Sequence, residues 1–311
     1  MKLFDCHCDT VLRLYAENRT LDDRETAFSL SGCAPYESVC QVFAFWSDDK
    51  KCGEDCYADF LCGTAYLKDQ LAVFGARLCT DAEALRTDGA FLKALFSVEG
   101  AKLLCGDPGR LAVLRKTGVR SLLPLWGGSD DIGGAWDTRE GLTSFGKAVV
   151  RECEKLGILV DVSHMSERSF YDALENTEKP IFASHSNSRA VCDTPRNLSD
   201  AQFRAVCERG GVVGVSLCAK HVSDRYFDRL PNAGEDFVGD VARHVLHYLS
   251  LGGEKHVCLG CDFDGTEPTE QLPDVSALVR LYERLLAERV DETTVQNIFC
   301  GNAGAFYEQN L

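Results

Sequence analysis

The chain has 311 residues, 45% of them hydrophobic, which is enough to bury one sizeable core. Its formal net charge of −15 argues against nucleic acid as a partner, because phosphate binding needs a basic surface. No apolar run approaches the roughly 20 residues that span a bilayer. The polar start MKLFDCHCDT also differs from a secretory leader. We therefore expect a cytoplasmic protein without a membrane partner.

The chain carries 16 cysteines, a high number for its length. They show no pair of CxxC knuckles, and Cys52 and Cys56 form one isolated CxxxC in an acidic stretch. Without a leader, a large chain of this kind favours reduced thiols over a disulfide framework. We expect most of these cysteines to act as small buried hydrophobic residues.

Short runs of continuous apolar residues recur along the chain. Continuous apolarity, rather than alternation, is typical of strands that are buried on both faces. The runs predict strands at 2–7, 40–46, 94–100, 119–126, 157–164, 180–186, 211–218 and 256–263.

The segments between these runs have apolar residues at helical spacing. The FDCHCDT stretch leads into a helix near Thr10, and Ser199 with Gln202 forms a capping-box pattern that opens a helix at 200–208. Alternating strands and helices predict a parallel sheet, and eight such units predict a single (β/α)8 barrel domain over residues 1–311. A doubly wound open sheet is the alternative fold, although no GxGxxG follows an early strand. Further helices are predicted at 56–77, 143–156, 235–250 and 274–289, and in the C-terminal segment.

Metal-binding and titratable residues gather at the predicted strand ends. In a (β/α)8 barrel the active site forms where the C-terminal ends of the strands meet. Taken singly, Asp9 could cap the helix near Thr10, His164 could be a core histidine, and Asp161 could be a structural carboxylate. Because histidines and carboxylates stand at several separate strand ends, one shared site is favoured. The residues at these ends are His7, Asp9, Glu99, His164, His185, Asp262 and Asp264.

The other histidines have positions that favour different roles. His244 and His247 are three residues apart in the middle of an outer helix, which predicts partly buried surface roles rather than a metal site. His221 follows the seventh predicted strand, near the mouth of the barrel, where it could contact a substrate.

The residue types at the strand ends suit metal ions. Imidazole and carboxylate groups are zinc ligands, and residues two apart on a strand, such as His7 and Asp9, point the same way. Three histidines and two carboxylates exceed the need of one tetrahedral zinc. They fit two metal ions about 3.5–4 Å apart, with a bridging carboxylate and a hydroxide between them. Such a pair lowers the pKa of water and polarises a carbonyl, which predicts hydrolysis of an amide or ester.

The strings DCHCDT, SVEG, DVSH, ASHSNSRAVCDTPRNLSD and GCDFDG occur in this order at the predicted strand ends. They resemble the signatures of the membrane (renal) dipeptidase family of binuclear zinc peptidases, in a bacterial cytoplasmic-type member, over essentially the whole chain. The resemblance implies that His7 and Asp9 hold one zinc ion and that His164 and His185 hold the other. It also implies that Glu99 bridges both ions.

The resemblance implies substrate contacts as well. Arg196, in TPRN, matches an arginine that holds the substrate carboxylate, a role that suits a planar guanidinium. Asp262 matches the aspartate that contacts the substrate amine and assists the leaving group, whereas Asp264 is expected to stabilise a loop. Trp126 stands where mammalian members carry a histidine that contacts the scissile carbonyl region. Its indole N–H can donate a hydrogen bond but cannot exchange a proton.

The expected activity is hydrolysis of dipeptides with a free C-terminal carboxylate by a metal-bridging hydroxide, with Glu99 and Asp262 as catalytic residues. One alternative is another binuclear amidohydrolase, a class that typically shows HxH on the first strand and a carbamylated lysine on the fourth. A second alternative is a metal-binding relative that has lost catalysis. The relatives also imply a homodimer.

Overall fold

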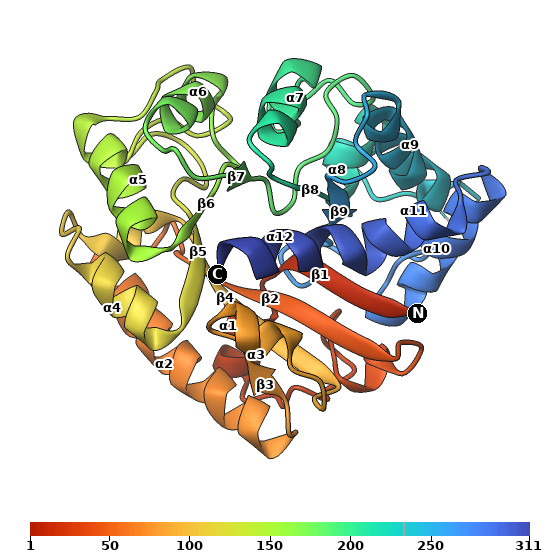
Figure 1. Cartoon of the computed structure of the whole chain (residues 1–311), viewed down its shortest axis with the longest axis horizontal. Helices are drawn as coiled ribbons and strands as arrows, with labels where there is room; N and C mark the ends of the chain where they lie inside the picture. Colours follow the sequence, from red (N-terminus) through yellow and green to blue (C-terminus); the bar gives the residue numbers. More distant parts are fainter. Residues whose placement is uncertain (233) are drawn as a thin grey trace.

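The computed structural model describes residues 1–232 and 234–311 and confirms the predicted barrel. Eight parallel strands follow the order β7-β6-β5-β4-β2-β1-β9-β8, and a bridge between Ala183 and Val213 links β7 to β8, so that the ring is nearly closed (Figure 1). The strands of the ring are β1 (Lys2–Cys8), β2 (Ser38–Trp46), β4 (Leu92–Glu99), β5 (Val119–Leu123), β6 (Leu159–Asp161), β7 (Ile181–Phe182), β8 (Val213–Val215) and β9 (Val257–Leu259).

The structure differs from the sequence-based prediction in two details of the strands. A short strand, β3 (Arg77–Leu78), pairs with β4 outside the ring and was not predicted. The last four strands of the ring are two or three residues long, much shorter than the apolar runs that predict them. Three residues after the ends of β6 and β9, the backbone turns at His164 and Asp262, which take positive φ values of 65° and 63°. Such strained residues cluster at functional sites.

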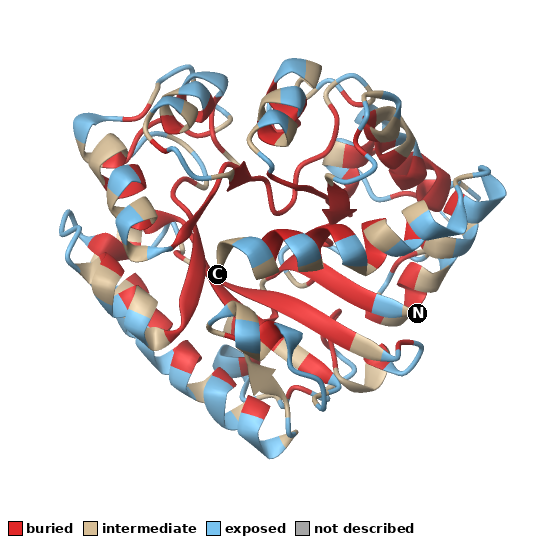
Figure 2. Cartoon of the chain, in the orientation of Figure 1, coloured by how far each residue is buried: buried red, intermediate tan, exposed pale blue. Residues whose placement is uncertain are grey.

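Helices surround the ring, and their buried sides face the strands (Figure 2). The predicted capping box is confirmed: the Ser199 hydroxyl accepts from the Gln202 N–H, and the Gln202 side chain accepts from the Ser199 N–H. Within residues 1–232 and 234–311, none of the helices is both long and apolar enough to cross a membrane. The α-helices are α1 (Thr10–Glu17), α2 (Gly53–Val73), α3 (Ala82–Arg86), α4 (Arg110–Thr117), α5 (Ser144–Leu156), α6 (Glu167–Glu175), α7 (Asp200–Glu208), α8 (Ala219–Val222), α9 (Phe237–Ser250), α10 (Leu278–Ala287), α11 (Glu292–Gln296) and α12 (Asn302–Asn310).

The C-terminal helix α12 crosses one opening of the ring (Figure 1). Its Tyr307 ring lies 5.3 Å from the ring of Phe4 and 5.8 Å from that of Phe182, between ring centroids. Phe4 lies near the start of β1, so α12 covers the N-terminal ends of the strands. The C-terminal ends of the strands therefore remain as the face on which a substrate site can form.

The sixteen cysteines are all free thiols in the described chain, and most are buried, as expected from the sequence. Several of them, including Cys6 and Cys258, pack among the aromatic residues beneath the strand ends. The inside of an eight-stranded barrel is narrow and is filled by side chains, so small apolar residues such as cysteine fit there.

His244 does not have the surface role that its position on an outer helix predicts. It lies on α9 but is fully buried. Its Nδ1 accepts the N–H of Ser188 at 3.0 Å, and its Nε2–H donates to the carbonyl of Val222 at 2.8 Å. The ring thereby joins the segment after β7 to the end of α8. His247, one turn further on, is partly buried and lies 2.8 Å from the Asp200 carboxylate.

We expect the buried His244 ring to make the fold less stable as the pH falls. Burial lowers the pKa of this imidazole from 6.5 to about 4. The contribution of the neutral ring is complete above pH 6.5 and is lost as the pH falls towards 4, a total of about 3 kcal/mol. Urea unfolding at several pH values measures this effect. As the pH falls over this range, the free energy of unfolding of the wild type should decrease more steeply than that of His244→Gln, by up to about 1.4 kcal/mol per pH unit. Parallel pH profiles for the two proteins would contradict this assignment.

Candidate metal centre

The carboxylate of Glu99, the last residue of β4, lies among three imidazoles that come from distant parts of the chain. Its Oε1 is 3.2 Å from His164 Nε2 and 3.6 Å from His185 Nε2. Its Oε2 is 3.6 Å from His7 Nε2. The two oxygens of one buried carboxylate therefore face two different groups of side chains.

The first group contains Glu99, His164 and His185. The two Nε2 atoms of His164 and His185 are 2.9 Å apart. On the other side of each ring, His164 Nδ1 donates to the Trp126 carbonyl at 2.8 Å, and His185 Nδ1 lies 2.7 Å from the Ser184 hydroxyl. Burial lowers the pKa of both imidazoles, that of His164 to about 4. If both neutral rings carry their proton on Nδ1, their Nε2 atoms present facing lone pairs, which a cation would stabilise.

The second group contains His7, Asp9 and Asp262. His7 Nε2 lies 3.3 Å from Asp9 Oδ2 and 3.8 Å from Asp262 Oδ1. Asp9 stands at the start of α1, but its side chain caps none of the described helix N–H groups, so the helix-cap explanation is wrong. Burial and the nearby Glu99 carboxylate raise the pKa of Asp9 to about 6. Burial likewise raises the pKa of Asp262 well above its usual range.

The donor set fits divalent metal ions. Three carboxylates lie close together in a buried region, where their mutual repulsion is costly unless a cation compensates it. Among the described residues, Asp9 Oδ1 is buried without a hydrogen-bond partner, which leaves it free to bind an ion. Imidazole nitrogen and carboxylate oxygen together are the ligands that zinc takes.

Arg196 lies beside this cluster and is buried. Its Nη1 donates to the Ser186 hydroxyl and its Nη2 donates to the His185 carbonyl, both at 3.0 Å. Its Nε is buried and has no partner among the described residues. Burial lowers the pKa of this guanidinium, while the charges of Asp262 and Glu99 oppose that change. The charge of Arg196 therefore acts on Asp262 and Glu99, although its side chain is buried beneath the cavity and is not among the residues that line it.

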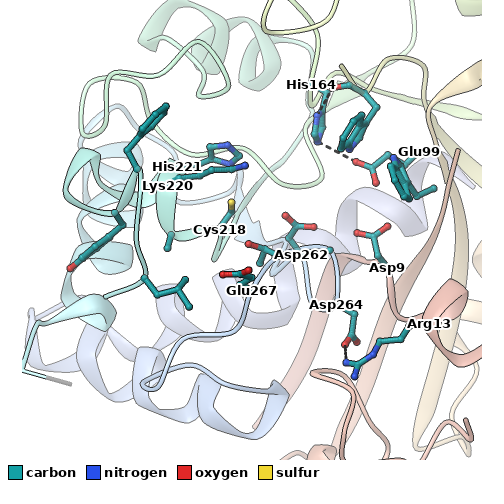
Figure 3. Close-up of a pocket in the computed structure, with 18 of the residues that line it drawn as sticks. Asp9, Arg13, Glu99, His164, Cys218, Lys220, His221, Asp262, Asp264 and Glu267 are labelled. Atoms are coloured by element: carbon teal, nitrogen blue, oxygen red, sulfur yellow. Dashed lines mark hydrogen bonds and ion pairs between the residues drawn. The ribbon is translucent and has the colours of Figure 1, made fainter. Parts of the chain in front are cut away.

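A cavity of about 690 Å³ opens above the cluster (Figure 3). Asp9, Glu99 and Asp262 point into it, and His164 approaches Glu99 from the side. Trp126 lines one wall, with its ring stacked on that of His164 at 6.2 Å between centroids. The cavity is large enough for a ligand of a few residues, as binding pockets commonly are.

Several lining residues were not singled out from the sequence as site residues. Trp46 ends β2 and packs against Trp126, with 5.1 Å between ring centroids, while Cys218 and Lys220 follow β8. The rule that strand ends form the site could have identified Trp46 and Cys218, because each ends a predicted apolar run. His221, expected near the mouth, does line the cavity.

Asp264 stabilises a loop, as expected from the sequence. Its carboxylate accepts from the Thr10 hydroxyl at 2.6 Å, from Arg13 Nη1 at 3.0 Å and from the Ala27 N–H at 2.9 Å. These bonds tie the loop after β9 to α1 and to the segment that follows it. Although Asp264 lines the cavity, its oxygens are already occupied by these donors.

Two solved structures have the same barrel over the whole chain. One is a dipeptidase of peptidase family M19, which is 26% identical, with a TM-score of 0.90 over 100% of this chain and 98% of that chain. The other is a metallopeptidase from Rhodobacter sphaeroides, solved with a phosphinate mimic of the dipeptide L-Ala-D-Ala. It is 25% identical, with a TM-score of 0.91 over 100% of this chain and 99% of that chain.

Two curated proteins are similar in sequence to this chain. An uncharacterised Klebsiella pneumoniae protein from the pqqA 5' region is 34% identical over 239 residues, which are 73% of this chain and 86% of that protein. An uncharacterised dipeptidase of Schizosaccharomyces pombe is 32% identical over 225 residues, which are 69% of this chain but only 50% of the yeast protein. The family model for membrane dipeptidases matches residues 1–305. The chain therefore belongs to the membrane dipeptidase family, peptidase family M19, and is a metallo-dipeptidase.

Proposed function

We propose that this enzyme hydrolyses dipeptides with a free C-terminal carboxylate and that two zinc ions bind around Glu99. The observation that carries the proposal is the division of the Glu99 carboxylate, whose Oε1 faces His164 and His185 and whose Oε2 faces His7. A carboxylate with this surrounding would serve as a ligand on both of its sides. In this assignment His164 and His185 would hold one zinc ion, and His7 and Asp9 would hold the other.

When bound, the zinc ions supply a water of lowered pKa and polarise the scissile carbonyl. The protein's own contribution starts with Asp262. Burial raises the pKa of this carboxyl, and the charges of Asp9 and Glu99 raise it further, while His7 opposes them. An aspartate in this position can take up a proton during the reaction and deliver it to the departing amine. Asp262 lines the cavity, where such a leaving group can reach it.

Arg196 and Trp126 supply substrate contacts in this proposal. The buried guanidinium of Arg196 carries the positive charge that a C-terminal carboxylate needs, and its orientation is held by Ser186 and by the His185 carbonyl. Trp126 presents its indole to the cavity beside His164. Because an indole exchanges no proton, Trp126 orients the substrate and leaves proton transfer to Asp262.

Metal removal tests the proposal directly. Protein treated with EDTA and verified to be metal-free should lose dipeptide hydrolysis by about 1,000-fold or more, and added Zn²⁺ should restore it at two equivalents. The substrate panel should contain L,L and L,D dipeptides, each as the free acid and as the C-terminal amide. Undiminished hydrolysis by the metal-free protein would contradict the metal mechanism. Equal rates on free acids and amides would contradict carboxylate recognition.

The same panel distinguishes the alternatives. β5, the fourth strand of the ring, reads VRSLL and has no lysine for the carbamylated ligand of other binuclear amidohydrolases. A relative without catalysis would bind two zinc ions tightly and hydrolyse none of the dipeptides. A cytoplasmic location, a homodimer and the action of residues 1–311 as one domain stay predictions from the sequence.

A further inference from the structure

His7 and His185 share one hydrogen-bonding partner on the side of their rings that faces away from Glu99. The Ser184 hydroxyl lies 2.7 Å from His185 Nδ1 and 3.4 Å from His7 Nδ1. The two rings lie against each other, with 3.9 Å between centroids and 34° between their planes. One ring comes from β1 and the other follows β7, so a single hydroxyl contacts one imidazole from each proposed zinc site.

A buried carboxylate lies behind this hydroxyl. Asp161 is the last residue of β6 and is fully buried. Its Oδ1 accepts the backbone N–H groups of Ser163 at 2.9 Å and of Ser184 at 3.0 Å, which hold the carboxylate in place. Its Oδ2 is buried and has no hydrogen-bond partner in the part of the chain that is described. Candidate ligand atoms of Asp161, His7 and His185 all lie within 4.8 Å of one another.

We propose that Ser184 and Asp161 are positioning residues that together set the tautomers of His7 and His185. Both Nδ1–H groups donate to the Ser184 oxygen, which leaves the Ser184 O–H available to Asp161 Oδ2, the carboxylate oxygen that has no partner among the described residues. This assignment uses the two acceptor sites of a hydroxyl and directs its one donor toward the free carboxylate oxygen. Both Nε2 atoms then keep their lone pairs on the side of Glu99, where the proposed zinc ions bind.

The inference rests on the proposed function, because it takes His7 and His185 as metal ligands. In this inference Ser184 and Asp161 together support one histidine of each proposed zinc site. His164, the remaining histidine of the cluster, is oriented separately, since its Nδ1 donates to the Trp126 carbonyl at 2.8 Å. Loss of the Ser184 hydroxyl should therefore disturb one histidine of each site and leave His164 unaffected.

The test compares the zinc- and cobalt-loaded enzymes of four proteins: wild type, Ser184→Ala, Asp161→Asn and Ser121→Ala. Ser121 is a matched control, because it is a buried serine on a neighbouring strand and its hydroxyl has no hydrogen-bond partner among the described residues. The dissociation constants of both metals are measured by chelator competition, and the visible absorption of Co²⁺ reports the ligand geometry. Thermal unfolding of the metal-free proteins separates these effects from general stability.

Ser184→Ala should raise both metal dissociation constants by about 10- to 100-fold and change the Co²⁺ spectrum, whereas Ser121→Ala should do neither. Asp161→Asn should act in the same direction, and it keeps an oxygen for the two backbone N–H groups if Ser184→Ala does not fold. Wild-type metal affinity and spectrum in both site variants would overturn the inference. Weakened binding at only one metal site would also overturn it. A wild-type protein that binds no metal would instead contradict the proposed function.

Discussion

Glu99→Gln is expected to lower the metal content of the enzyme below that of the wild type and to reduce kcat/KM for dipeptides by about 1,000-fold or more. A glutamine has nearly the shape of glutamate but no charge, and its NH₂ group donates hydrogen bonds where a metal needs a lone pair. Since the Glu99 oxygens face His7 on one side and His164 with His185 on the other, the change affects both proposed zinc sites. Elemental analysis of the purified protein and steady-state kinetics measure the two effects.

The matched control is Glu267→Gln. Glu267 lines the same cavity but is exposed at its rim, so this substitution should leave the metal content unchanged. Thermal unfolding of metal-free wild type and Glu99→Gln shows whether a loss of activity comes from unfolding or from loss of metal. A Glu99→Gln protein with two bound zinc ions and wild-type kinetics would refute the bridging role.

Arg196→Ala is expected to raise KM for free-acid dipeptides on the order of 100-fold, because it removes a buried partner for the substrate carboxylate. It should also lower the free energy of unfolding by about 2–4 kcal/mol. The guanidinium donates to the Ser186 hydroxyl and to the His185 carbonyl, and truncation leaves both buried acceptors without their donor. Dipeptide kinetics and urea unfolding measure the two effects separately.

Arg196→Lys and amidated substrates refine this experiment. Lysine keeps the charge but lacks the planar fork that serves two acceptors at once, so an intermediate KM is expected. The increase in KM from wild type to Arg196→Ala should be much smaller for dipeptide amides than for free acids. If Arg196→Ala instead keeps the wild-type KM and loses metal, the residue acts through His185 rather than through the substrate.

The barrel could be predicted from the sequence because each strand is buried on both faces. Every run of continuous apolar residues corresponds to a strand of the ring. The lengths of the later strands could not be predicted, since the apolar run 157–164 continues beyond β6 into the buried segment that carries His164. Nor could the burial of His244, because the loops that cover α9 come from distant parts of the chain.

The sequence by itself determined the family, the order of the strands along the chain and the kinds of side chain at their ends. These properties depend on local patterns: apolar runs, capping residues and short motifs. Only the tertiary structure decided that the oxygens of Glu99 face different histidines and that Ser184 contacts two imidazoles. It also decided that the Asp9 side chain makes no capping hydrogen bond to α1. The physical reason is that these distances depend on how distant strands close into one ring, and on backbone turns at residues such as His164.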